Sequence, residues 1–140
     1  DPKLVRTMGD AARRGVDVRI MLSGVSDAML MLALSRSYYD DLLDAGVRVF
    51  ESDDIMLHAK TAVVDRVWST VGSSNLDYRS FIHNDEVNAV IVGAEFGREL
   101  EDLFRSDLER SKEVTRKEWK ERPLSQRGKE WVSRWFKYWL

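Results

Sequence analysis

The sequence predicts an α/β protein in which a mixed β-sheet is flanked by helices and an amphipathic helical tail follows at the C-terminus. Two stretches, "AARRGVDVRI" and "LLDAGVRVF", each pass from helical periodicity through a glycine into β-branched residues, a pattern typical of a sheet covered by helices. Three later stretches, "HAKTAVVD", "VWSTVGS" and "EVNAVIVG", have the composition of strands. We therefore expect about five strands, near the usual size of a sheet.

The first helix and strand are predicted over residues 4–22. Gly15 is the expected end of the helix, because glycine readily adopts the left-handed conformation found there, and a strand should follow over 16–22. One helical face collects the apolar residues Leu4, Val5, Met8, Ala11 and Ala12. That face should pack against the sheet.

The second unit repeats this order. Ser35 or Ser37 should cap its helix, Gly46 should end it, and a strand should follow over 47–50. The segment between the two units, "SGVSDAMLMLALS", is apolar and rich in methionine. It predicts either a buried helix or a loop that faces substrate.

The rest of the chain predicts a hairpin and then further helices. "RVW" should connect the strands on either side of it, and helical spacing begins at Glu95. The apolar stripe of that helix is Phe96, Leu100, Leu103, Phe104 and Leu108. Two shorter helical segments follow, separated by Pro123.

Composition narrows the classes of function. The chain has no cysteine, so neither a thiolate nucleophile nor a thiolate metal site is available. Residues 1–111 carry 13 basic and 20 acidic side chains, whereas residues 112–140 carry 9 and 4. An acidic body argues against free nucleic acid as the partner. No apolar run reaches the ~18 to 20 residues of a membrane span.

The candidate site begins with His58 and Lys60. Side chains alternate along a strand, so these two residues should point the same way and reach one phosphate-sized group. Asp65 lies at an odd offset from His58 and should point to the other face. We therefore give Asp65 a supporting role, either in pairing with an arginine or in holding a turn.

The following strand should bring a Gly-Ser-Ser-Asn turn back beside His58. Ser73 and Asn75 can donate hydrogen bonds there, while Gly72 lets the backbone approach an anion closely, with Ser74 beside it. Glu86 is the expected partner of the other ring nitrogen of the histidine, which would fix the tautomer of the imidazole.

This set of residues suits phosphoryl transfer without a metal or another cofactor. An imidazole can attack phosphorus or protonate a leaving oxygen, and a lysine with neutral donors can hold the charge. Metal chemistry fits less well, because His58 has no second histidine or cysteine at ligand spacing and Lys60 would repel a divalent cation.

The segment "HAKTAVVDRVWSTVGSSN" resembles the H-x-K-x4-D-x6-G-S motif of the phospholipase D superfamily, and "VGSSNLDYRSFIHNDEVNAVI" resembles its bacterial cardiolipin synthase branch. The resemblance runs along nearly the whole chain and implies a phospholipase D-like fold. It also implies that the phosphodiester site is lined by His58, Lys60, Ser73, Asn75 and Glu86. The chain departs from the pattern at Asp85, where an aromatic residue is expected, and in the acidic "ESDDIM" before the motif.

The resemblance further implies a catalytic half-domain over 1–111 and a basic, tryptophan-rich tail over 112–140. Family members use two motifs and this chain has one, because His83 lacks the lysine and the Gly-Ser turn. The second motif should come from an upstream half of a longer polypeptide, as the start at Asp1-Pro2 suggests, or from a second copy of the chain.

The implied activity is cardiolipin synthesis from two phosphatidylglycerol molecules through a phosphohistidine. The alternatives are a phospholipase D that hydrolyses phospholipids, a single-motif homodimeric endonuclease, and a membrane-binding module without catalysis. The tail sets an apolar face beside the basic residues Lys129, Arg134 and Lys137, which suits either an anionic membrane surface or the protein's own core. The apolar residues of that face are Trp131, Val132, Trp135, Phe136 and Trp139. We expect the fragment to be peripheral at the bacterial cytoplasmic membrane.

Overall fold

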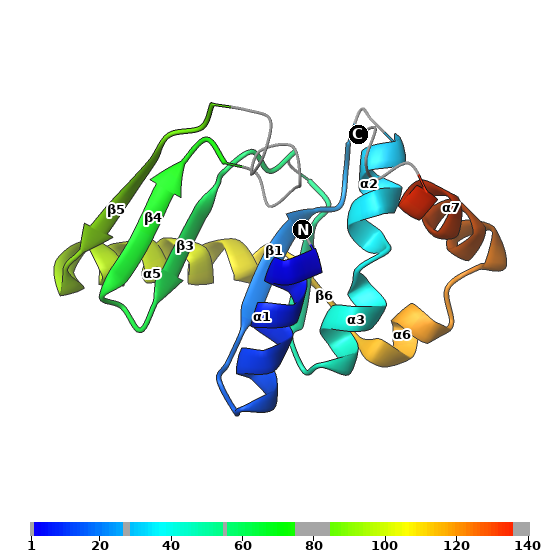
Figure 1. Cartoon of the computed structure of the whole chain (residues 1–140), viewed down its shortest axis with the longest axis horizontal. Coiled ribbons are helices and arrows are strands. Elements are labelled where there is room, and N and C mark those ends of the chain that lie inside the picture. The colour runs from blue at the N-terminus through cyan, green and yellow to red at the C-terminus, as the bar shows by residue number, and fades with distance from the viewer. Residues whose placement is uncertain (1, 27–28, 55, 75–84, 136–140) are drawn as a thin grey trace. The chain divides into compact units, whose positions relative to one another are not determined.

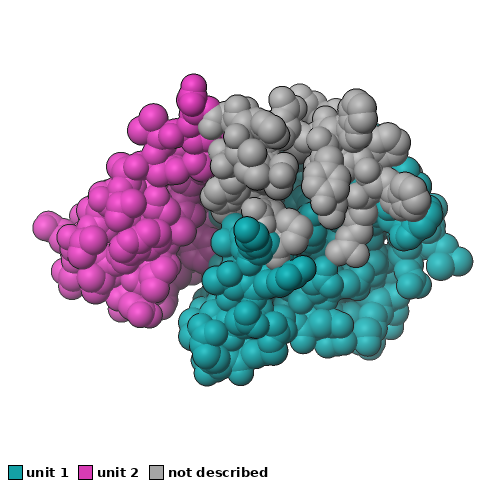
Figure 2. Space-filling view, viewed as in Figure 1, with its two compact units in different colours: residues 1–57, 111–140 teal, residues 58–110 magenta. Residues whose placement is uncertain are grey.

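The computed structural model describes residues 2–26, 29–54, 56–74 and 85–135 (Figure 1). The chain divides into two compact units, drawn in different colours in Figure 2. The first unit combines residues 1–57 with residues 111–140, and the second is formed by residues 58–110. The second unit is thus inserted, along the chain, between the two segments of the first.

The first unit contains a mixed sheet. Its strands are β1 (Arg19–Ser23), β2 (Arg48–Ser52) and β6 (Lys112–Val114), in the order β1-β2-β6. The first two run parallel, and the third runs antiparallel to β2. Its helices are α1 (Pro2–Arg13), α2 (Met29–Arg36), α3 (Tyr39–Asp44), α6 (Arg116–Lys120) and α7 (Leu124–Trp135).

Both predicted helix-glycine-strand junctions are present. Gly15 has a φ of 92° after α1, and Gly46 has a φ of 88° after α3. These left-handed conformations cost a residue with a Cβ atom more than they cost glycine, so each glycine ends its helix and turns the chain into a strand. The mixed α/β fold with helices beside its sheets is confirmed.

The core of the first unit lies between its sheet and helices. Its buried members are Tyr39, Leu42, Val47, Val49, Val114 and Trp119. The rings of Tyr39 and Trp119 pack at a tilt of 43° with centroids 4.9 Å apart, which joins α3 to α6. Burial of this apolar surface is the main stabilising term of the unit.

Arg122 ties the C-terminal helices to this core. Its guanidinium lies 4.0 Å from the centre of the Trp119 ring, and it forms ion pairs with Asp40 on α3 at 2.9 Å and with Glu130 on α7 at 3.0 Å. Glu130 is buried, and burying an unpaired carboxylate is costly. Its ion pair with Arg122 offsets that cost. The described part of the tail therefore packs against residues 1–57 within the first unit.

The second unit contains an antiparallel sheet with the order β3-β4-β5 and one helix that crosses a face of it (Figure 1). Its elements are β3 (Thr61–Val64), β4 (Trp68–Gly72), β5 (Asn88–Val92) and α5 (Ala94–Glu109). Val63, Ser69 and Ile91 face one another across the three strands and are at least half-buried. Alternation places a second set on the other face, where every member is exposed: Val64, Trp68, Val90 and Val92.

Several sequence expectations were wrong. The described strands pair as two sheets of three, not as one sheet of about five, because composition predicts a strand but not its partner. The capping serine of the second helix is also absent. Tyr38 occupies the N-cap of α3 and its side chain does not cap the helix, while the Ser37 hydroxyl donates to the carbonyl of Leu34.

Other expectations were resolved or shifted. "SGVSDAMLMLALS" contains the helix α2, whose first residue, Met29, is exposed. The strand expected from His58 begins at Thr61 instead. The helix predicted from Glu95 is confirmed as α5, although Leu103 in its apolar stripe is largely exposed. Over the described ranges, we find no helix with the length and apolar character needed to cross a membrane.

Candidate active site

The candidate site is built on the hairpin of β3 and β4. The turn that joins them runs from Val64 to Val67, and its two central residues, Asp65 and Arg66, have φ values of 51° and 58°. Two left-handed central residues define a type I′ turn, which matches the natural twist of a two-stranded ribbon. Asp65 is therefore placed in a turn, one of the two supporting positions that its offset from His58 predicts.

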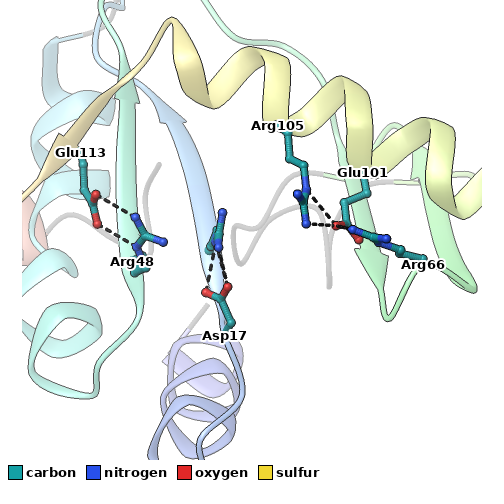
Figure 3. A network of polar contacts seen from close by, with 7 residues as sticks. Asp17, Arg48, Arg66, Glu101, Arg105 and Glu113 are labelled. Atoms are coloured by element: carbon teal, nitrogen blue, oxygen red, sulfur yellow. Dashed lines mark hydrogen bonds and ion pairs between the residues drawn. The ribbon is translucent and has the colours of Figure 1, made fainter.

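This turn is fastened to α5. A Cβ atom on Gly97 would lie 2.3 Å from the carbonyl oxygen of Arg66, so only glycine allows the helix to approach this closely. The Arg66 guanidinium pairs with Glu101 at 2.9 Å, and Arg105 pairs with the same carboxylate (Figure 3). These arginines hold the pKa of Glu101 below its ordinary value.

His58 and Lys60 are brought together as predicted, just before β3. The Lys60 ammonium lies 2.9 Å from Nδ1 of His58 and donates to the His58 carbonyl oxygen at 2.8 Å. An ammonium group has only donors, so Nδ1 must accept in this contact. The neutral imidazole then carries its proton on Nε2, and the side chain of His58 is exposed.

Ser73 follows the end of β4 and faces the start of β5. The strand pairing extends to a bond from the Gly72 amide to the Lys60 carbonyl at 3.1 Å, which brings the Gly-Ser-Ser segment back along the His58 segment. The Ser73 hydroxyl donates to the Glu86 carboxylate and accepts from the Val87 amide at 3.1 Å. The structure thus joins two of the predicted site residues.

Glu86 is not placed on the histidine by the contacts of this structure. Its carboxylate accepts the hydroxyl of Ser73, while Nδ1 of His58 faces Lys60. The pairing of Glu86 with His58 stays a prediction. Two further residues singled out from the sequence, Asn75 and His83, lie outside the described residues.

Gly72 and Ser74 contact Asn88, a residue that the sequence reasoning missed. The Asn88 amide nitrogen donates to the Ser74 hydroxyl, and its oxygen accepts from the Ser74 amide at 3.4 Å. A Cβ atom on Gly72 would lie 2.0 Å from that oxygen. The glycine therefore serves the approach of a neighbouring strand, a reason separate from the anion contact that the sequence predicts. In the sequence, the signal that could have identified Asn88 is that it is a polar residue two positions after Glu86.

The acidic segment before His58 is anchored elsewhere. Glu51 is buried in the first unit, where Arg36 binds it through two bonds of 2.8 and 2.9 Å and the Tyr39 hydroxyl donates to it at 2.9 Å. Burial is the main cause that raises the pKa of Tyr39 well above its ordinary value, and the Glu51 carboxylate raises it further. Glu51 is thus a structural ion-pair partner within the first unit.

The backbone that leads to His58 is also fixed. The Leu57 amide donates to the hydroxyl of Ser23 at 3.3 Å, and that hydroxyl donates to the Val25 carbonyl at 2.6 Å. Nearby, a Cβ atom on Gly24 would lie 2.3 Å from the Asp53 carboxylate. The end of β1 therefore holds the segment on the N-terminal side of the motif.

Comparison with known proteins identifies the fold and the family of this chain. A crystal structure of a phospholipase D family member, Nuc from Salmonella typhimurium, shares the fold with a TM-score of 0.67 and 18% identity, over 81% of this chain and 74% of that one. The family model described as cardiolipin synthase, phospholipase D-like domain, matches residues 1–108. The chain belongs to this family, as its motif predicts.

The relatives in this family are much longer proteins. Cardiolipin synthase 2 of Bacillus anthracis is 38% identical over 114 residues, which are 81% of this chain and 22% of that protein. A cardiolipin synthase of Listeria monocytogenes is 37% identical over 134 residues, which are 96% of this chain and 28% of that protein. The chain thus spans about a quarter of the length of these relatives.

Proposed function

We propose that this chain supplies one of two catalytic motifs of a phosphatidyltransferase that makes cardiolipin from two phosphatidylglycerol molecules. The observation that carries the proposal is the grouping of His58 with Lys60, and of Ser73 with Glu86, at neighbouring ends of the hairpin and β5. The family membership and the two cardiolipin synthases described above support the lipid substrate.

The reaction needs two histidines. The imidazole of one attacks phosphorus, the bond to the glycerol oxygen breaks, and the second histidine protonates the departing glycerol. The hydroxyl of a second phosphatidylglycerol then gives its proton to that second histidine and attacks phosphorus, which breaks the nitrogen-phosphorus bond and releases cardiolipin. His58 is one member of this pair.

Lys60, Ser73 and Asn75 act on the charge that develops at the phosphate. An ammonium group and neutral donors fixed before the reaction stabilise the transition state without reorganising. Lys60 sits 2.9 Å from the His58 ring, close enough for both side chains to meet one phosphate group. The proposed chemistry uses no metal and no other cofactor.

The second motif is proposed to come from an upstream half of the same polypeptide, with a second copy of this chain as the alternative source. The greater length of the relatives favours the upstream half. The half-domain over 1–111 and the tail over 112–140 remain the proposed division, with β6 and Trp119 of the tail contributing to the first unit.

The tail is proposed to meet anionic lipid. On α7, Glu130 and Ser133 are buried, whereas Trp131 is 63% exposed and Val132 is exposed beside it. Tryptophan with nearby basic residues suits the headgroup region of a membrane. We propose on this basis that the fragment is a peripheral protein at the bacterial cytoplasmic membrane.

The test is lipid mass spectrometry after incubation with phosphatidylglycerol vesicles. The chain together with its upstream half should yield cardiolipin and glycerol, and His58→Ala should abolish both products. His83→Ala is the matched control, because the second histidine lacks the motif, and it should retain synthesis. Phosphatidic acid as the sole product would contradict transfer and indicate hydrolysis. Absence of turnover in every combination would contradict the lipid assignment.

A further inference from the structure

The start of β5 forms a template for the Gly-Ser-Ser segment. The Ser73 amide donates to the Val87 carbonyl at 3.0 Å, and the Val87 amide donates to the Ser73 hydroxyl at 3.1 Å. Asn88 then continues the template with its side chain, because both ends of its amide bond Ser74. Ser73 is thus held by Val87, and by Glu86 through its hydroxyl, whereas Ser74 is held by Asn88.

The Asn88 amide also explains the space around Gly72. Its oxygen would lie 2.0 Å from a Cβ atom on Gly72, which is far below any allowed contact. The amide therefore occupies the place that a side chain at position 72 would need. Glycine and asparagine are matched across the strand pair, where Gly72 and Asn88 are direct partners.

Because Asn88 both accepts from and donates to Ser74, its orientation is defined. A side chain that offered only an acceptor could not hold the Ser74 hydroxyl oxygen in the same way. These exposed bonds join residues 14 positions apart in the sequence, so they fix the path of residues 72–74 against the neighbouring strand without contributing to a core. The residue they fix most directly is adjacent to Ser73, the serine of the motif.

We infer that Asn88 is a positioning residue for the phosphate-binding turn: it contacts no substrate itself and holds Ser74 so that the Ser73 hydroxyl keeps its place. This inference rests on the proposed function, because Ser73 acts on phosphate only there. Without the Asn88 side chain, residues 72–74 are free to rotate, and the affinity of the site for a phosphate group falls.

The test uses inorganic phosphate as the probe and amide NMR spectra of the 140-residue chain as the readout. Asn88→Ala should weaken phosphate binding about 5- to 10-fold, as expected for the loss of a net hydrogen bond that preorganises the site. Ser74→Ala should weaken it by a similar factor. The double variant should bind no more weakly than either single variant, because both changes remove the same contact.

A matched control on the same strand is Val90→Ala. Val90 is exposed and does not contact the Gly-Ser-Ser segment in any bond described above, so its variant should bind phosphate as the unmodified chain does. Thermal unfolding of every variant should occur at nearly the same temperature. If Asn88→Ala lowers the phosphate affinity while the unfolding temperature stays the same, Asn88 positions the site and does not merely stabilise the fold.

Two results would overturn the inference. Phosphate affinity unchanged by Asn88→Ala would refute it while leaving the proposed function intact, provided that His58→Ala abolishes binding. The inference would also be refuted if the fold-losses of phosphate affinity in the two single variants multiplied in the double variant, because the two side chains would then act independently. Phosphate binding that is insensitive to both His58→Ala and Lys60→Met would instead show that the proposed function fails, and the inference would fall with it.

Discussion

The two units of this chain are stabilised in different ways. In the described residues, every buried apolar side chain belongs to the unit of residues 1–57 and 111–140. Among residues 58–74 and 85–110 of the other unit, only Ser69 and Gly97 are buried. It is held by a tight hairpin, a close helix approach and hydrogen bonds between strand ends. The candidate site therefore lies on the less densely packed unit, where its geometry depends on polar contacts.

The largest expected contrast is between two leucines. Leu42→Ala removes a side chain that is 2% exposed in the core of the first unit, and the lost burial and the remaining cavity should lower the free energy of unfolding by about 2–5 kcal/mol. Leu103→Ala removes one that is 59% exposed in the second unit and should change it by less than about 0.5 kcal/mol. Urea denaturation measures both. Equal losses in the free energy of unfolding would show that apolar packing stabilises the second unit as strongly as the first.

The next effect concerns buried charge. Glu51→Gln leaves Arg36 without its counter-charge in a partly buried place, and should cost on the order of 3 kcal/mol. The matched control is Glu113→Gln, which breaks an equally close pair with Arg48 that is about 40% exposed (Figure 3). That change should cost well under about 1 kcal/mol. Calorimetric unfolding of the two variants provides the comparison, and a larger loss for Glu113→Gln would contradict it.

A pair of helical glycines compares the units directly. Gly97→Ala drives a Cβ atom toward the Arg66 carbonyl, and the strain should destabilise the second unit by about 1–3 kcal/mol. Gly128→Ala, in α7 of the first unit, meets no atom within 4 Å and should instead stabilise its helix by about 0.5–1 kcal/mol. Hydrogen exchange of the amides in β3 and α5 would report the first effect. Stabilisation by both substitutions would show that the hairpin turn can yield to the helix.

A smaller effect appears in acid. Arg48 holds the pKa of Glu113 below its ordinary value of 4.5, so the folded state favours the ionised carboxylate. The resulting stability is present above the unfolded pKa and is lost as the pH falls through the lowered folded pKa. Unfolding midpoints measured from pH 6 downward should therefore fall more for the unmodified chain than for Glu113→Gln. Parallel curves would mean that this exposed pair contributes nothing measurable.

The smallest effect in energy is the tautomer of His58. The contact of Lys60 with Nδ1 predicts that the neutral ring is protonated at Nε2. Nitrogen NMR should detect that tautomer in the unmodified chain and a mixture in Lys60→Met. A predominance of the Nδ1-protonated ring in the unmodified chain would contradict the contact and favour the alternative partner, Glu86.

The sequence predicted the elements better than their partners. Gly15 and Gly46 could be placed because a helix end is a local event that glycine alone makes easy. The strand β6 could not, because its residues Lys112–Val114 include two charged side chains and pair only where β2 offers an edge. Strand pairing of this kind depends on tertiary context.

The candidate site shows the same limit. His58 and Lys60 are two positions apart, so spacing alone brings them together. The partners of Ser73 and Ser74 lie at the start of β5 or just before it, more than a dozen residues further along, and depend on the register of β4 with β5. No periodicity in the sequence specifies that register for Asn88, which is why its contact was missed.

The order of the two units along the chain has a consequence for synthesis. β2 and β6 pair through Val49 and Val114, and the whole second unit is translated between them. The first unit must therefore wait for its last strand while some 60 residues emerge, a delay of several seconds at ~5–20 residues per second. During that time the hairpin and α5, whose contacts are local, can already fold. The candidate site can then form before the sheet of the other unit is closed.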